Sequence, residues 1–120
     1  MPKLLIVDDE VDVLDIAKRY FSKRGVDVFT ADNGEGAVRI VGNENPDLVL
    51  LDFNLPDMNG TEVLKKIREE LKSEVKVMMM TGADEGQIKK EVEHLNVFQY
   101  LFKPLTLDVL EKIVLAELNA

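Results

Sequence analysis

The sequence predicts an α/β protein built around a parallel β-sheet. Short apolar runs alternate along the chain with longer stretches of helical periodicity, which is the pattern of repeated βα units. The run Leu48–Leu51 is apolar at every position, as expected for a strand that is covered on both faces. No linker, internal repeat or low-complexity segment interrupts the pattern. We therefore expect five βα units in one domain over residues 1–120.

The first βα unit is predicted at the N-terminus. Its strand is Lys3–Val7, which ends at a pair of acidic residues. Apolar residues then recur three or four positions apart, as on one face of a helix, at Val11, Leu14, Ala17 and Phe21. Gly25 marks the expected end of this helix.

The second and third units follow directly. Val26–Ala31 is a less apolar run, so we expect a strand at an edge of the sheet. Asn33 and Gly34 turn the chain into a helix with apolar residues at Ala37, Val38 and Val41. The third strand, Leu48–Leu51, is followed by a loop over residues 52–60. The helix after this loop has apolar residues at Val63, Leu64, Ile67 and Leu71.

The fourth and fifth units complete the chain. Val75–Met80 is the fourth predicted strand, and Asp84 with Gln87 resembles a capping box that opens a helix. This helix has apolar residues at Ile88, Val92 and Leu95. Phe98–Phe102 is the fifth predicted strand. The last helix carries its apolar residues at Leu107, Leu110, Ile113, Val114 and Leu118.

Composition and charge exclude several classes of function. The net charge of −8 argues against nucleic-acid binding by this chain alone, because a nucleic acid requires a cationic surface. The absence of cysteine excludes disulfides and thiolate chemistry. No apolar run is long enough to cross a membrane, and the N-terminus does not resemble a signal peptide. A cytoplasmic location is the expectation.

Polar and charged residues gather at the carboxyl ends of the predicted strands. Asp8 and Asp9 follow the first strand, Asp52 the third, Thr81 the fourth and Lys103 the fifth. Ligands of open α/β sheets bind at this edge, near the point where the strand order reverses. Two carboxylates about 4 Å apart repel each other by about 4 kcal/mol at an effective dielectric near 20. We therefore expect a cation to bind at this cluster. Oxygen ligands without histidine or cysteine favour Mg²⁺, or Mn²⁺ in its place, over zinc.

Asp52 is the candidate nucleophile of this cluster. A carboxylate can attack phosphorus to form an aspartyl phosphate. The metal would neutralise charge on the phosphoryl oxygens, while Lys103 and the Thr81 hydroxyl would contact others. A purely structural role for Asp52 and Thr81 is also consistent with the sequence. Asp52 begins a segment rich in turn formers, and threonine is common in strands for its β propensity alone.

Four segments together resemble the receiver domain of two-component response regulators. They are LLIVDDE, LVLLDFNLPDMNG, VMMMTGAD and YLFKP. The resemblance implies a flavodoxin-like, doubly wound sheet of five parallel strands in the order 2-1-3-4-5, with five helices. Asn96 stands where the family usually has glycine before the fifth strand. Because asparagine tolerates left-handed backbone, we expect this turn to be kept.

The resemblance also implies a metal site. Asp9 and Asp52 would bind Mg²⁺ directly, and Asp8 would act largely through water. Asn54, two residues after the acceptor, would offer its backbone carbonyl to the same ion. No further cofactor is implied.

By the same resemblance, Asp52 would be the phosphoacceptor, and Thr81 and Lys103 would contact the phosphoryl group. Tyr100 occupies the family's aromatic switch position, three residues before the lysine. The implied protein is a signalling switch rather than an enzyme in the ordinary sense, although it would catalyse its own phosphorylation and dephosphorylation. Its output would run through the face formed by the fourth helix, fifth strand and fifth helix.

The implied partners are a sensor histidine kinase and either a downstream protein or a fused output domain. A phosphorylation-dependent dimer is one form that the output could take. Three other functions agree less well with the residues of this site. A phosphatase of the haloacid dehalogenase type needs an acid where this chain has Asn54, and a flavin site would not have acids after the first strand. The remaining alternative, a receiver that is never phosphorylated, conflicts with the presence of all five site residues, which are Asp8, Asp9, Asp52, Thr81 and Lys103.

Overall fold

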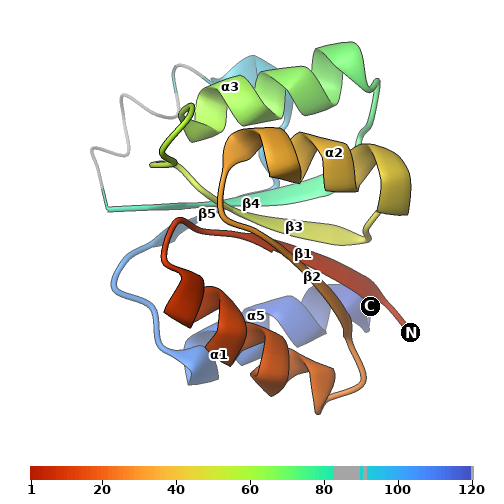
Figure 1. Cartoon of the computed structure of the whole chain (residues 1–120), viewed down its shortest axis with the longest axis vertical. Helices are drawn as coiled ribbons and strands as arrows, with labels where there is room; N and C mark the ends of the chain where they lie inside the picture. The colour runs from red at the N-terminus through yellow and green to blue at the C-terminus, as the bar shows by residue number, and fades with distance from the viewer. Residues whose placement is uncertain (83–89, 91, 120) are drawn as a thin grey trace.

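A five-stranded parallel β-sheet forms the middle layer of the protein, with helices on both faces (Figure 1). The computed structural model describes residues 1–82, 90 and 92–119. The strands are β1 (Lys3–Val7), β2 (Asp27–Ala31), β3 (Leu48–Asp52), β4 (Lys76–Thr81) and β5 (Gln99–Phe102). Their order is β2-β1-β3-β4-β5, and every neighbouring pair is parallel, which confirms the predicted sheet.

The strand positions agree with the pattern of hydrophobicity. β3 is buried along its whole length, as its uninterrupted apolar sequence predicted. β2, the less apolar run, lies at an edge of the sheet. β1 has the predicted bounds, and the other strands differ from prediction by one residue at one or both ends. Differences of this size are usual at strand ends, where local sequence carries little information.

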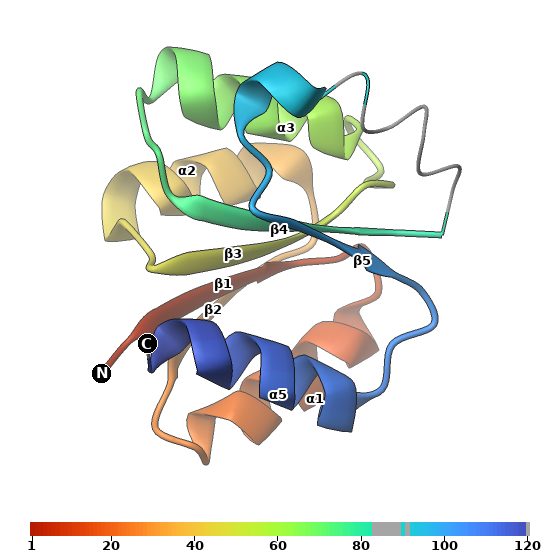
Figure 2. The same cartoon turned by 180° about the vertical axis from the view of Figure 1, so that it is seen from behind.

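Two described helices cover each face of the sheet (Figures 1 and 2). They are α1 (Val11–Ser22) and α5 (Leu107–Leu118) on one face, and α2 (Gly34–Glu44) and α3 (Gly60–Lys65) on the other. Each pair closes a separate apolar core, one containing Leu50 and the other Leu51. The alternation of side chains along β3 therefore supplies both cores from one strand. None of the helices in the described ranges is long and apolar enough to span a bilayer.

Fewer positions of α1 are buried than the apolar periodicity of its sequence predicted. Leu14, Ala17 and Phe21 are buried, but the Val11 side chain is 53% exposed. Val11 begins the helix directly after the chain leaves the carboxyl end of β1. The apolar residue of the first turn therefore remains in contact with solvent, although it shares the periodicity of the buried positions.

The predicted fourth helix, including its capping residues Asp84 and Gln87, lies largely outside the described residues. Its described end is a short 3₁₀ turn, Glu93–Leu95, so the described ranges do not test the prediction of five helices. Asn96 follows in left-handed backbone with φ of 57°, which confirms that asparagine serves in this turn. Val92 and Leu95 are buried against the same core as α2 and α3.

Hydrogen bonds from Arg68 connect the end of the 3₁₀ turn and Asn96 to the helical segment that continues α3. α3 continues into one π-helical turn, Lys66–Glu70, which carries Arg68. The Arg68 guanidinium donates to the carbonyls of Leu95 and Asn96 at 2.8 and 3.0 Å, and to that of Ser73 at 2.9 Å. Burial lowers the pKa of Arg68 from its ordinary value. The charged side chain thus serves here as a donor to three backbone carbonyls rather than as a solvated surface group.

The loop after β3, residues 53–59, closes tightly on itself before α3 begins. The Gly60 N–H donates to the Phe53 carbonyl at 2.6 Å, and Asn54 forms an isolated antiparallel bridge with Asn59. The Asn59 side chain then caps α3 by accepting from the Glu62 N–H at 2.9 Å. These contacts leave no space at Gly60. A Cβ there would lie 2.8 Å from Met79 Sδ and 3.0 Å from Phe53 Cα.

We expect Gly60→Ala to destabilise the protein by about 1–3 kcal/mol, because the added methyl group would displace packed strand and loop atoms. The matched control is Gly42→Ala in α2. Its Cβ would lie 3.5 Å from Leu71 Cδ2, which is ordinary contact. Alanine is favoured over glycine in a helix by about 1 kcal/mol, so this variant should be more stable than the wild type. Urea denaturation measures both, and a Gly60→Ala variant as stable as wild type would contradict the packing argument.

Candidate functional site

Two buried carboxylates lie side by side at the carboxyl edge of the sheet. β1 and β3 pair with Val7 opposite Leu51, so the next residues along each strand, Asp8 and Asp52, are neighbours. Asp8 is 5% exposed and Asp52 is 1% exposed. The sequence predicted that both would reach this edge, and the structure brings them together.

Lys103 reaches this pair from the last strand. Its backbone N–H donates to the Thr81 carbonyl at 3.0 Å, which extends the β4–β5 pairing by one residue and fixes the lysine at the sheet edge. The ammonium lies 2.9 Å from Asp52 Oδ2 and 3.9 Å from Asp8 Oδ2. One cation therefore serves two carboxylates. The Lys103–Pro104 peptide bond, which could not be assigned from sequence, is cis.

Charge and burial shift the pKa values of these groups. Burial raises the pKa of Asp8 above its ordinary value; the Glu10 N–H, which donates to Asp8 Oδ1 at 2.9 Å, opposes this, and the charge of Asp52 adds to it. For Lys103, burial lowers the pKa, but the hydrogen bond to Asp52 and the charges of Asp52, Asp8 and Asp9 raise it overall. The lysine therefore remains a cation at neutral pH.

Both oxygens of Asp52 have hydrogen-bond donors. Oδ2 accepts from Lys103, and Oδ1 accepts from the backbone N–H of Asn54 at 3.2 Å. Asn54 itself is an exposed residue in the loop after β3. The carboxylate is thus oriented by one donor from a neighbouring strand end and one from its own loop.

A group of acidic residues adjoins the buried pair. Carboxylate oxygens of Asp8, Asp9 and Glu10 lie within 4.8 Å of one another, a spacing that could hold a metal ion. Asp9 and Glu10 are exposed. Glu10 was missed by the sequence analysis, although its place directly after the two aspartates was a usable signal. Among the described residues Asp52 does not belong to this group, and its Oδ2 accepts a hydrogen bond from Lys103.

Thr81 and Tyr100 lie on a common face of the sheet. Thr81 is fully buried at the end of β4, and Tyr100 is half-buried in β5. In the β4–β5 register Tyr100 pairs with Met79, two residues before Thr81. Because side chains alternate along strands, all three point to the face covered by α2 and α3, where Tyr100 packs against the core.

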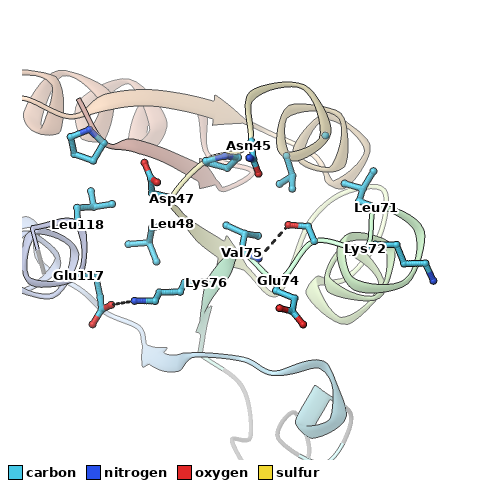
Figure 3. A pocket seen from close by; sticks show the side chains of 15 residues that line it. Asn45, Asp47, Leu48, Leu71, Lys72, Glu74, Val75, Lys76, Glu117 and Leu118 are labelled. Atoms are coloured by element: carbon cyan, nitrogen blue, oxygen red, sulfur yellow. Dashed lines mark hydrogen bonds and ion pairs between the residues drawn. The ribbon is translucent and has the colours of Figure 1, made fainter.

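A separate groove of about 1020 Å³ opens at the opposite end of the sheet (Figure 3). It is lined by the amino ends of β3 and β4 and by the loops before them. The Lys76 and Glu117 side chains that border it form an ion pair at 3.0 Å. Ligands of open α/β sheets bind at the carboxyl ends of the strands, so the edge that carries Asp52 remains the functional candidate.

Comparison with known proteins agrees with this geometry. The family model for the response regulator receiver domain matches residues 4–115. Sporulation initiation phosphotransferase F of Bacillus subtilis is 36% identical over 112 residues, which cover 93% of this chain and 90% of the relative.

Two further proteins extend the comparison. The alkaline phosphatase synthesis transcriptional regulatory protein PhoP of Bacillus subtilis is 36% identical over 104 residues, covering 87% of this chain but only 43% of the relative. The crystal structure of a two-component response regulator from Clostridium difficile superposes with a TM-score of 0.87 at 29% identity, covering 99% of this chain and 97% of that one. By sequence and by fold, the chain belongs to the family of response regulator receiver domains.

Proposed function

We propose that this protein is a switch turned on by phosphorylation of Asp52. The observation that carries the proposal is the contact of 2.9 Å between Lys103 Nζ and the buried carboxylate of Asp52, with the Asp8 carboxylate beside it. A buried aspartate at a strand end, with its charge balanced by one ammonium, is a costly arrangement for a purely structural role. It is suited to an acceptor that must meet a highly charged group.

Asp52, Lys103 and Thr81 have different roles in the proposed phosphoryl transfer. An Asp52 oxygen attacks the phosphorus of a phosphohistidine, a P–O bond forms, and the P–N bond to the imidazole of the kinase breaks. Lys103, which contacts Asp52 in the unmodified protein, is close enough to follow the new charge onto a phosphoryl oxygen. The Thr81 hydroxyl would donate to another oxygen of the same group.

The donor set fits Mg²⁺ or Mn²⁺. The described side chains that could ligate an ion here all offer oxygen: Asp8, Asp9 and Glu10 lie together, and Asp52 is adjacent to Asp8. We assign Asp9, Asp52 and the Asn54 carbonyl as direct ligands and Asp8 as a ligand through water. Burial raises the pKa of Asp8 and so disfavours its negative charge, and a bound cation would relieve this cost. When bound, the ion would neutralise charge on the phosphoryl oxygens.

The output surface in this proposal is the face of the fourth helix, β5 and α5. Thr81 and Tyr100 share one face of the sheet, so a threonine drawn toward the phosphoryl group would open space that the Tyr100 ring can enter. Phe102 and Val109 are 42% and 44% exposed on β5 and α5. Single apolar residues at this exposure are common on protein surfaces, so the choice of this face rests on the path through Thr81 and Tyr100.

The partners in this proposal follow from the same chemistry. A sensor histidine kinase would supply the phosphoryl group, and the receiver over residues 1–120 would act on a downstream protein, a fused output domain or a second copy of itself. The relative named as a sporulation initiation phosphotransferase supports phosphoryl transfer, and the relative named as a transcriptional regulator supports a fused output. Direct nucleic-acid binding and membrane binding are not part of the proposal, and the expected location is the cytoplasm.

We expect Asp52→Asn to abolish phosphorylation by acetyl phosphate with Mg²⁺, because the amide keeps the shape of the side chain without the nucleophilic carboxylate. Hydroxylamine-sensitive radiolabel on the purified protein is the measurement. The control is Asp32→Asn, which alters an exposed carboxylate just after β2 and should label normally. Label that persists in Asp52→Asn at the wild-type level would place the acceptor elsewhere.

Asp8→Asn should stabilise the metal-free protein at pH 7 by about 1 kcal/mol, since functional sites commonly hold destabilising groups. The folded-state pKa of Asp8 lies above its ordinary value of 3.8, so its ionisation opposes folding at pH values above the folded pKa. The advantage of the variant should therefore disappear below about pH 3.8, where Asp8 is protonated in both states.

Thermal unfolding in a chelator from pH 3 to 8 measures this effect. Asp9→Asn, at an exposed neighbouring carboxylate, is the control and should change the melting temperature less. An Asp8→Asn variant less stable than wild type at pH 7 would show that the buried carboxylate is a stabilising group.

Beryllium fluoride, which mimics the phosphoryl group, should turn the Thr81 side chain toward Asp52 and bury the Tyr100 ring more deeply. Crystal structures with and without the mimic would show both movements, and Asp52→Asn, treated in the same way, is the control that should not change. Identical Thr81 and Tyr100 rotamers in the two wild-type structures would rule out this path of output.

A further inference from the structure

The N-terminus of α2 is capped by two side chains, and one of them comes from the loop after the candidate acceptor. Asn33, directly before the helix, accepts from the Gly36 N–H at 2.7 Å. Asp57 accepts from the Gly34 N–H at 2.7 Å through Oδ1 and from the Glu35 N–H at 3.0 Å through Oδ2. Together these bonds satisfy three of the four backbone donors that the start of a helix leaves free. A cap from the residue directly before the helix, such as Asn33, is usual. The cap from Asp57 instead joins two segments that are distant in the chain.

Packing reinforces the same junction. Gly34 is buried at the start of α2, and a Cβ at this position would overlap the Met58 side chain and lie 2.8 Å from Val63 Cγ2. Asp57 and Met58, which are consecutive in the loop, therefore both contact the first turn of α2. One contact is a pair of hydrogen bonds and the other is close packing against a glycine.

The loop that carries Asp57 also carries part of the candidate site. It follows directly after Asp52, and its Asn54 N–H donates to Asp52 Oδ1. The bridge between Asn54 and Asn59 and the bond from Gly60 to Phe53 close the loop into a short frame. Movement of the middle of this frame would displace Asn54, because only two residues separate Asn54 from Asp57.

We propose that Asp57 is a positioning residue for the phosphoacceptor site, which it supports by tying the loop of residues 53–59 to the N-terminus of α2. This inference rests on the function proposed above, since it assigns Asp57 a role in placing Asn54 beside Asp52. The role requires both of its oxygens, one for each N–H of the helix. The hydrogen bonds from Gly34 and Glu35 lower the pKa of Asp57, so the double acceptor is present at neutral pH.

Proton–nitrogen NMR spectra of the wild type, Asp57→Ala, Asp57→Asn and Asn33→Ala provide the test. In the metal-free protein, Asp57→Ala should accelerate hydrogen exchange of the Asn54 amide and shift its resonance. Titration with Mg²⁺ should give a dissociation constant about three- to tenfold weaker than wild type, below the ~10–100-fold typical of groups bonded directly to a metal ligand. Asp57→Asn keeps one acceptor oxygen and should lie between Asp57→Ala and the wild type.

Asn33→Ala is the matched control, because it removes the local cap of the same helix and leaves the link to the loop. It should lower the melting temperature while the Asn54 amide and the Mg²⁺ affinity stay near wild type. Unchanged Asn54 exchange and unchanged affinity in Asp57→Ala would overturn the proposal, as would equal losses in Asp57→Ala and Asn33→Ala. A wild-type protein that neither binds Mg²⁺ nor labels at Asp52 would instead refute the proposed function.

Discussion

Repulsion between buried carboxylates is the constraint on which the site depends. Parallel pairing of β1 with β3 puts Asp8 next to Asp52, and both are almost completely removed from water. The Lys103 ammonium, fixed by backbone pairing with Thr81, offsets part of this cost but lies closer to Asp52 than to Asp8. Within the described part of the chain, the edge is therefore left with uncompensated negative charge, and its energy falls when a cation or a change in charge distribution relieves that excess.

The residues around this edge are closely packed and hydrogen-bonded. Glycine allows the backbone to approach closely at Gly60, against Phe53 and Met79, and at Gly34, against Met58. The loop between them is held by backbone bonds and by Asp57. An acceptor carboxylate that must keep a fixed orientation needs such support, because small displacements weaken charge-assisted contacts steeply. By contrast, Phe102 and Val109, on β5 and α5, are exposed.

Most of the fold could be predicted because its signals are local. The apolar run of β3 and the spacing of Leu14, Ala17 and Phe21 in α1 each report burial through a short stretch of chain. The prediction that Val11 is buried was wrong because its signal was also local. Periodicity indicates which residues share a helix face, but not how far the core beneath that face extends. The π-helical turn Lys66–Glu70 had no signal, because apolar spacing alone does not distinguish it from a continued α-helix.

The class of the sheet, its strands and the residues that end each strand follow from residue type and short-range spacing, so the amino acids alone were enough to predict them. Three contacts depend instead on how the chain folds: the ion pair of Lys103 with Asp52, the grouping of Glu10 with Asp8 and Asp9, and the capping of α2 by Asp57. Such contacts join residues whose separation in the chain carries no periodic signal, or depend on rotamers within one loop. Their existence is set by how the helices pack on the sheet, which is a property of the whole core.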